Sequence, residues 1–199
     1  MSRTRKPPER WLPLQTERLV LREFREEDLD DIHAYGSDPE VTRYMIWGPN
    51  TPEVSREFLE RKLDEQKIWP RSAVSVALAL AGGSRMIGAA EIRMFDAGPR
   101  TGEIGYTLAR PYWRQGYASE VAEALLRQGF EAMGMRRIIA TCEVANTGSW
   151  RVMEKLGMRR EGCFRQDVKV GRRWRDSYHY ALLATEWRAR RAAVAPSST

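Results

Sequence analysis

The segment from Glu103 to Glu120, EIGYTLARPYWRQGYASE, constrains the fold more than any other part of the chain. A strand pattern ends near Leu108, a loop containing Gly116 follows, and a helical pattern begins at once. A strand that feeds a helix in this way aims main-chain N–H groups and the positive end of the helix dipole at one point, where a diphosphate fits. A side chain at position 116 would block that approach. The segment predicts a phosphate-binding βαβ unit, and an ordinary strand–helix turn is the alternative.

Two other phosphate-binding motifs are missing. The chain has no GxxxxGK[ST] sequence, so no lysine is placed for a β- or γ-phosphate, and no GxGxxG follows the first expected strand. A P-loop site and a dinucleotide fold are therefore both unsupported.

Strand and helix patterns fill the rest of the chain. The helix expected after Thr51 has the clearest start, because a hydroxyl stands at the N-cap, proline at the first position and an acid in the first turn. Expected strands span 16–24, 72–80, 85–95, 103–108, 137–142, 158–169 and 173–185, and expected helices span 26–35, 51–67, 118–133 and 146–156. This order predicts an α/β (α+β) fold, in which a mixed, mostly antiparallel sheet of about seven strands with four helices surrounds a central βαβ unit.

The length of 199 residues suits one domain with a core that is stable without disulfides or metals. We place that domain at 14–187, between flexible tails at 1–13 and 188–199. No apolar run approaches the roughly 18 residues of a membrane helix, and the N-terminus lacks the apolar centre of a signal peptide. Cys142 and Cys163 form neither a CxxC pair nor a disulfide framework, so a cytoplasmic location is expected.

The net charge of +6 and the pI near 9.6 admit a polyanionic partner. That partner is either a nucleic acid or the phosphates of a cofactor, and the basic residues near the two ends also suit solvated tails. No RNA-binding or helix-turn-helix signature accompanies the charge, so the charge alone decides little. His33 and His179 are too few and too scattered for a metal site or a nucleophilic triad, so no metal is expected.

The run Trp113 to Ala118, WRQGYA, resembles the acyl-CoA pyrophosphate loop of the GNAT superfamily of N-acetyltransferases, usually written [RQ]xxGx[GA]. The glycine and the small residue match, whereas Trp113 replaces the usual arginine or glutamine. Pro111 to Glu120 is similar to the PxYWGxGxAxE run of the RimJ/RimL-like branch, where tryptophan is common. Downstream, Asn146 to Met158 resembles that branch's NxxSxRVxEKLGF segment. The resemblance covers about residues 14–187 and implies the GNAT fold.

The resemblance implies transfer of an acetyl group from acetyl-CoA to an amine by direct attack. In the family, the fourth strand of this order splays from the fifth, and its main-chain groups hold the pantetheine arm and the oxyanion. The residues implied to bind acetyl-CoA are Tyr106, Thr107, Leu108, Trp113, Arg114, Gln115, Gly116, Tyr117, Ala118, Ser119, Asn146 and Ser149. Asn146 is equally well explained as a plain helix N-cap.

The catalytic groups are less well defined. Many GNAT enzymes carry a tyrosine on the helix after Asn146 as proton donor to the thiolate, but Met153 stands there and cannot donate. The acid role then shifts to Ser149, or the thiolate leaves without a proton donor. The second option is open because the thiol of coenzyme A is about as acidic as that of cysteine, whose pKa is about 8.5. For the general base we rank Glu103 first, Asp167 second and Glu91 third, with a water chain as the alternative.

Three alternatives remain for the acceptor. The first is the N-terminal amine of a protein, as in the ribosomal-protein acetyltransferases, which would bring nucleic acid close only indirectly, through the ribosome. The second is a small amine, and the third is an acyl-CoA-binding or nucleic-acid-associated protein without catalysis. Segments 45–57 and 169–176 decide between the first two, and their aromatic and arginine residues suit a peptide or an anionic group as well as plain packing. A homodimer is expected by resemblance only.

Overall fold

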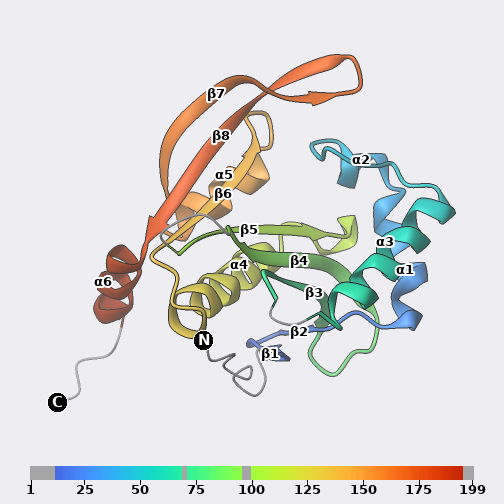
Figure 1. Ribbon diagram of the computed structural model, residues 1–199, viewed down its shortest axis with the longest axis horizontal. Helices are drawn as coiled ribbons and strands as arrows, with labels where there is room; N and C mark the ends of the chain where they lie inside the picture. Colours follow the sequence, from blue (N-terminus) through green and yellow to red (C-terminus); the bar gives the residue numbers. More distant parts are fainter. Residues whose placement is uncertain (1–11, 69–70, 96–99, 195–199) are drawn as a thin grey trace, which may run out of the picture.

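The computed structural model describes residues 12–68, 71–95 and 100–194. A loop is expected at 96–100, between the strands expected at 85–95 and 103–108, and most of it lies outside the described residues, as does most of the N-terminal tail. One sheet runs in the order β1-β2-β3-β4-β5-β6-β8-β7 (Figure 1). Its strands are β1 (Leu14–Gln15), β2 (Leu19–Arg22), β3 (Ala73–Leu80), β4 (Met86–Met94), β5 (Thr101–Leu108), β6 (Arg137–Glu143), β7 (Arg159–Val170) and β8 (Arg173–Leu183). All neighbours pair antiparallel except β5 and β6. The predicted mixed, mostly antiparallel sheet is confirmed.

The described residues hold eight strands, where about seven were expected, because of a turn near the N-terminus. The Thr16 hydroxyl accepts a hydrogen bond from Leu19 N at 2.9 Å, and Thr16 N donates to the Leu19 carbonyl at 2.9 Å. These bonds bend the chain, so the strand expected at 16–24 is shortened to β2, and the two residues before the turn form the additional strand β1.

Six α-helices accompany the sheet in the described part of the chain, where four were expected. They are α1 (Leu29–Gly36), α2 (Pro39–Thr42), α3 (Pro52–Glu65), α4 (Tyr117–Arg127), α5 (Thr147–Lys155) and α6 (Ala184–Val194). The N-cap predicted for α3 is present, since the Thr51 hydroxyl accepts from Val54 N. Helix α4 continues through a π-helical turn, Gln128–Ala132, close to the predicted end.

The flexible C-terminal tail expected from residue 188 is wrong as far as Val194, because α6 occupies this segment. Trp187 in its first turns is only 1% exposed and stacks on Phe130 of the π-helical turn, with ring centroids 5.7 Å apart. Arg190 pairs with Glu123 of α4 at 2.8 Å. A buried tryptophan therefore holds α6 against the body, and this helix also crosses the domain boundary expected at 187.

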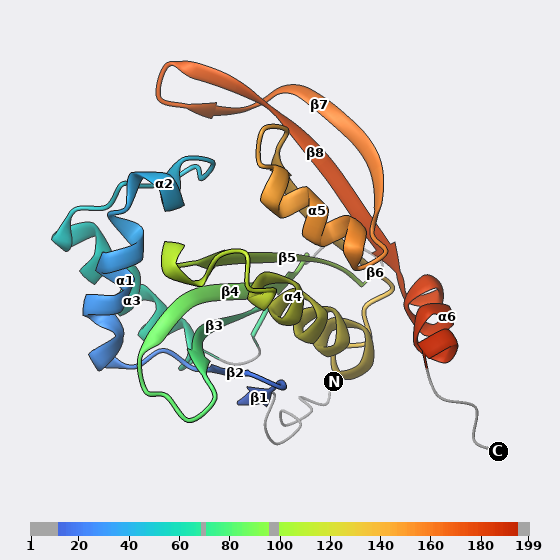
Figure 2. The ribbon, with the colours of Figure 1, turned by 180° about the vertical axis from the view of Figure 1, so that it is seen from behind.

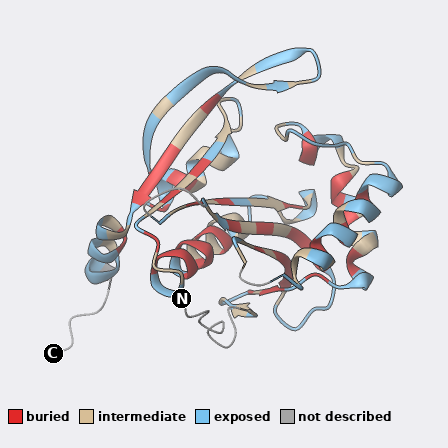
Figure 3. Ribbon diagram, viewed as in Figure 1, coloured by how far each residue is buried: buried red, intermediate tan, exposed pale blue. Residues whose placement is uncertain are grey.

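Helices cover both faces of the sheet, and each face has its own core. Helix α4 lies across β3 to β5 on one face, with α5 beside it (Figure 2). Its apolar side, which includes Val121 and Leu125, packs against strand residues such as Ile92 and Ile138. Helices α1 and α3 bury Ile32 and Leu59 against the other face. In Figure 3, α4 is mostly coloured buried, whereas the outer part of the β7–β8 hairpin is exposed.

Strands β5 and β6 pair over only a short stretch and then diverge. Their parallel register covers three pairs, which begin at Thr101 with Arg137 and end at Glu103 with Ile139. On its other side, β5 stays paired with β4 as far as Leu108. The main-chain groups of β5 that face β6 beyond Glu103 therefore have no strand partner within the described residues. We call this divergence the split.

The β7–β8 hairpin rises from the sheet and arches over α5 towards α2 (Figure 1). At its outer part, the Arg175 guanidinium donates to the Arg43 carbonyl at 3.0 Å and pairs with Glu143 at 2.7 Å. Arg43 directly follows α2, and Glu143 ends β6. The hairpin, the α2 segment and the end of β6 thus meet beside the split.

Candidate active site

Gly116 is the N-cap of helix α4, and its φ of 85° lies in the left-handed region. Arg114 also has a positive φ, 60°, so the chain turns sharply within three residues. Because glycine stands at the N-cap, the helix has no side-chain cap, and the N–H groups of its first turn lack that partner. A Cβ at position 116 would lie 3.4 Å from Arg18 Nη2. The local features expected for a phosphate loop are therefore present at this helix start.

A clamp formed by Thr16, Arg18 and Glu120 fastens the start of α4 to the turn between β1 and β2. The Glu120 carboxylate accepts from Thr16 Oγ1 at 2.5 Å, from Arg18 N at 2.8 Å and from Arg18 Nε at 2.8 Å. Arg18 Nη1 donates to the Gln115 carbonyl at 2.9 Å. The clamp therefore holds the chain on both sides of Gly116. Sequence reasoning missed it, because its two halves lie about a hundred residues apart.

Electrostatics keep the clamp charged at neutral pH. Burial pushes the pKa of the Glu120 carboxyl up, but the hydrogen bonds from Thr16 and from Arg18 outweigh it and hold the pKa below its usual 4.5. The Arg18 pKa is raised by its hydrogen bond to Glu120. Arg18 also lies over the Tyr117 ring, 4.5 Å from its centroid.

The polar side chains of the loop bond to the loop itself. Trp113 Nε1 donates to the Leu108 carbonyl at 2.7 Å, and Gln115 Nε2 donates to the Pro111 carbonyl at 2.7 Å. These bonds give Trp113 a role in shaping the loop, at the position where the family motif has arginine or glutamine. Arg114 is exposed, so its charge is free to face a phosphate. The segment Tyr117–Ser119 is half-buried in the first turn of α4.

The three strand residues expected near the cofactor lie in different environments. Leu108 is buried in the core on the α4 face. Thr107 points to the other face, since alternate strand residues point to opposite faces. Tyr106 is on the α4 and α5 face, and its hydroxyl donates to the Ser149 carbonyl at 3.4 Å. Burial raises the pKa of Tyr106 to about 12, so its phenol is protonated at neutral pH.

Asn146 and Ser149 lie at the start of α5, next to the split. The Asn146 side chain accepts from Ser149 N at 3.1 Å, so Asn146 is the N-cap of this helix. The Ser149 hydroxyl lies beside the Cys142 thiol of β6; burial raises the pKa of that thiol to about 11, and the hydroxyl offsets part of the rise. Two hydroxyl groups, from Ser149 and Tyr106, thus lie on the same side of the split.

The carboxylates Glu103 and Glu91 lie on the opposite face of the sheet from Tyr106. Glu103 pairs with Arg93 at 2.6 Å and accepts from Thr141 Oγ1 at 3.2 Å, across the last residues before the split. Glu91 belongs to a network with Lys62 at 3.0 Å and Ser75 at 2.6 Å. Burial raises the pKa of Glu91, but these two partners outweigh it and lower the pKa overall.

Asp167 is separated from the other carboxylates. It lies on β7 and contacts His179 Nε2 at 3.3 Å. His179 is in register with Thr141 of β6, the residue that bonds Glu103, so Asp167 stands three strand positions away from Glu103. At about 4.8 Å per strand the two backbones are roughly 14 Å apart. The side chains are closer than the backbones, because Glu103 bonds Thr141, Asp167 contacts His179, and these two residues are paired across β6 and β8. Of the two carboxylates, Glu103 is the one on the strand that borders the split.

A hollow of about 320 Å³ opens beside the clamp. It is lined by Glu17, Arg18, Gly116, Ser119, Glu120, Glu123, Lys155, Leu156 and Arg190. Two of its three cations are already paired, Arg18 with Glu120 and Arg190 with Glu123. Lys155 is exposed. The uncapped helix start therefore borders open space with a cation at its edge, which is room for a charged group.

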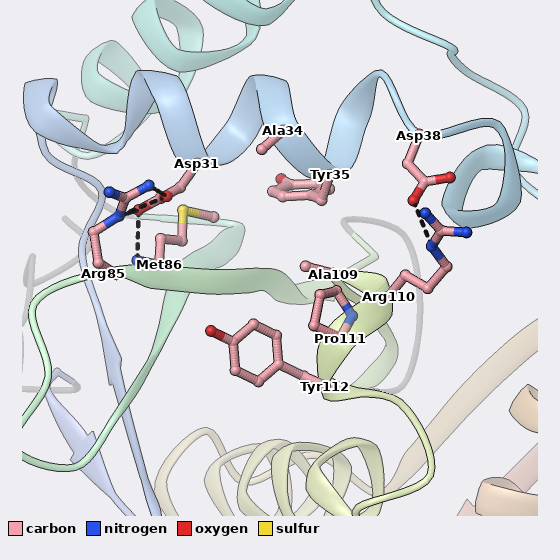
Figure 4. Close-up of a pocket in the computed structure, with 10 residues that line it drawn as sticks. All are labelled: Asp31, Ala34, Tyr35, Asp38, Arg85, Met86, Ala109, Arg110, Pro111 and Tyr112. Atoms are coloured by element: carbon pink, nitrogen blue, oxygen red, sulfur yellow. Dashed lines mark hydrogen bonds and ion pairs between the residues drawn. The ribbon is translucent and has the colours of Figure 1, made fainter.

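A second cavity, of about 390 Å³, lies away from the split, between α1 and the segment that follows β5 (Figure 4). Its two carboxylates are each paired with an arginine: Asp31 with Arg85 Nε at 2.8 Å and Asp38 with Arg110 at 3.0 Å. Tyr35 closes one side, and burial raises its pKa. The cavity holds no unpaired charge, and we assign it a structural role in tying α1 to the chain just before the loop.

Comparisons with known proteins decide the family. The model of the GNAT acetyltransferase domain matches residues 18–159. The uncharacterized N-acetyltransferase YnaD of Bacillus subtilis is 38% identical over 87% of this chain and 98% of its own length. The chain belongs to the GNAT acetyltransferase family. Another uncharacterized N-acetyltransferase, p20 of Bacillus licheniformis, is 33% identical over 87% of this chain and 97% of its own length.

Solved GNAT structures share the fold. The crystal structure of a GNAT-family acetyltransferase from Bacillus anthracis superposes with a TM-score of 0.77 at 38% identity, covering 88% of this chain and 100% of that one. The predicted GNAT fold and acyltransferase class are thereby confirmed. Within the described ranges there is no group of three or more histidine, cysteine or acidic residues that could hold a metal, and none of the helices there could span a membrane.

Proposed function

We propose that this GNAT enzyme transfers the acetyl group of acetyl-CoA to a primary amine by direct attack. The observation that carries the proposal is the split between β5 and β6 next to the uncapped start of α4. Unpaired strand groups and uncapped helix N–H groups on one side of the sheet suit the amides of a pantetheine arm and the negative charge of a diphosphate. When bound, acetyl-CoA supplies the activated thioester.

The residues proposed to hold the cofactor follow from this geometry. The main-chain groups of Tyr106 and the N–H of Leu108 face the split and would bind the pantetheine arm and donate to the oxygen that becomes negative. The main chain of Thr107, expected in the same role, faces Ala89 of β4 instead. The loop and helix start from Trp113 to Ser119 would hold the diphosphate, and Arg18 and Glu120 would keep that loop in shape. Asn146 would serve as N-cap and present the first turn of α5 to the same cleft.

The proposed proton transfers use groups on opposite faces of the sheet. Glu103, on the face opposite the cofactor loop, accepts the proton of the amine, directly or through water. Ser149 donates to the departing thiolate, and Tyr106 is a second hydroxyl in reach of the same place, which compensates for the absence of a donor at Met153. Because the sheet separates the proposed base from the proposed acid, each group acts on its own side of the reacting thioester.

For the acceptor we propose the N-terminal amine of a protein or peptide, as in the RimJ/RimL-like branch. A Bacillus subtilis relative named "Putative ribosomal N-acetyltransferase YdaF" is 28% identical over 51% of this chain and 56% of its own length. Its name supports the proposal, and the hairpin that meets the α2 segment beside the split supports it independently, because such walls suit an extended chain.

The test follows free thiol release with acetyl-CoA and separate panels of peptides and small amines. Thiol release with peptides, together with an acetyl group on the peptide's first residue by mass spectrometry, is the expected result. Release with small amines alone would replace the peptide by a small acceptor. If calorimetry detects no binding of acetyl-CoA, the transferase proposal fails at its first step.

A further inference from the structure

The β7–β8 hairpin ends in exposed cations. Lys169, Arg172 and Arg173 are all exposed, and we call them the basic tip. The outer hairpin's ion pairs, Arg175 with Glu143 and His179 with Asp167, leave the basic tip without a carboxylate partner among the described residues. Lys169 Nζ instead lies 5.6 Å from the centroid of the Trp174 ring, which is 55% exposed.

Strand geometry turns part of the basic tip towards the split. Arg173 and Arg175 are two residues apart on β8, so their side chains leave the same face of the hairpin. Arg175 reaches the Arg43 carbonyl and Glu143, which places that face towards α2 and the end of β6. Both ribbon views show the hairpin tip on the α2 side (Figure 1, Figure 2). Arg173 therefore extends the wall beside the split.

Three carboxylates on the face opposite the cofactor loop are already paired with cations. Glu91 is bonded to Lys62, Glu103 to Arg93 and Glu143 to Arg175, each within 3.0 Å. Residues 165–176 of the hairpin hold five lysine or arginine residues and two aspartates, Asp167 and Asp176, so this part of the chain has a formal charge of +3 and makes the field beside the split positive. A polyamine would be repelled on approach, whereas an acceptor with carboxylates would be attracted.

Distance restricts the size of that acceptor. Thr141 of β6, which bonds Glu103, is in register with His179 of β8, and Arg173 lies six residues further out. At about 3.3 Å per residue the separation is roughly 20 Å. A small amine held beside Glu103 cannot span it. An extended peptide, which advances about 3.3–3.6 Å per residue, reaches the basic tip with its sixth or seventh residue.

From this geometry we infer that the acceptor is an acidic peptide segment, which rests on the proposed transferase function. Its N-terminal amine would enter beside Glu103, and carboxylates at about the sixth and seventh residues would pair with the basic tip. The acceptor specificity would therefore be set by charge several residues away from the amine.

The test uses eight-residue peptides that share their first five residues and carry glutamate, glutamine or lysine at positions six and seven. Calorimetry gives peptide affinity, and thiol release gives kcat and KM. Two double variants with equal loss of charge are compared: R172A/R173A in the basic tip and R188A/R191A on α6, whose arginines are exposed but outside the active-site machinery. Acetyl-CoA affinity is measured for both.

For the natural chain we expect the glutamate peptide to bind at least about tenfold tighter than the lysine peptide. R172A/R173A should remove most of this preference by raising KM with little change in kcat or acetyl-CoA affinity, while R188A/R191A keeps it. The preference should shrink in 0.5 M salt, because exposed charges are screened. Moving the glutamates to positions two and three should weaken binding.

Equal affinity for the three peptides, or an unchanged preference in R172A/R173A, would overturn the inference while leaving the transferase proposal intact if thiol release continues. Tight binding of the glutamate peptide with no thiol release would support the acidic site and sink the transferase proposal. A single-stranded RNA of equal charge that displaces the glutamate peptide and binds more tightly would overturn the choice of a peptide.

Discussion

Replacing Gly116 with alanine tests the phosphate loop directly. The residue has a φ of 85°, and an L-residue pays about 1–2 kcal/mol to stay there. Its nearest non-neighbouring atom, Arg18 Nη2, lies 3.4 Å from the added Cβ, so contact adds little to this strain. For a chain of 150–250 residues, each kcal/mol lowers Tm by about 2–4 °C, so Gly116→Ala should lower Tm by about 2–8 °C.

The effect on the cofactor should be larger than the effect on stability. Relief of the strain rotates the peptide planes on both sides of residue 116, which turns main-chain N–H groups away from the phosphates. Loss of one hydrogen bond to a charged group is worth about 1.5–3 kcal/mol, so the Kd for acetyl-CoA should rise by about ten- to hundredfold. Isothermal calorimetry measures this Kd, and thermal melts measure the change in Tm.

Gly82 offers a matched control. It has a similar φ of 78° in the turn between β3 and β4, and a Cβ there would have no neighbour within 4 Å. Gly82→Ala should lower Tm by a similar amount and leave the acetyl-CoA Kd unchanged. If Gly116→Ala shows the same loss of Tm but binds acetyl-CoA within about twofold of the Gly82→Ala protein, the assignment of the loop to the diphosphate is refuted.

Three further predictions address the clamp and the catalytic groups. The pKa of Glu120 is lowered in the folded state, so its contribution to stability is present above about pH 4.5 and is lost as the pH falls through the lowered pKa. Glu120→Gln should therefore flatten the decrease in the free energy of unfolding that urea titrations measure between pH 7 and 3. Identical slopes for the natural chain and the variant would contradict this. Ser149→Ala should lower kcat by about tenfold to a hundredfold without changing acetyl-CoA affinity, and Tyr106→Phe should lower kcat further in the Ser149→Ala background; unchanged kcat in both single variants and the double variant would remove a protein acid from the mechanism. Glu103→Gln should lower kcat at least about tenfold, whereas Asp167→Asn should change it by less than about twofold. A larger loss of kcat in Asp167→Asn would show that Glu103 is not the general base.

Features that depend on neighbouring residues were predicted well from the sequence. The N-cap at Thr51, the hairpin turn near Gly82 and the helix start at Gly116 all lie where expected, because local hydrogen bonds and backbone preferences determine them. The tail expected from residue 188 was wrong, because the burial of Trp187 against Phe130 decides the order of α6 and depends on a distant helix.

The features of the candidate site likewise fall into local ones and ones that depend on distant segments. The sequence alone determined that a glycine stands between a strand and a helix, and that Met153 stands where many GNAT enzymes carry a tyrosine. It left Asn146 open between a helix N-cap and a pantetheine contact, and the structure shows the N-cap. Only the tertiary structure decided that Arg18 and Glu120 clamp the loop, that β5 leaves β6 after Glu103, and that Asp167 stands apart from Glu103. The physical reason is that these features depend on which strands pair and how far, and pairing between distant segments is set by the packing of the whole core.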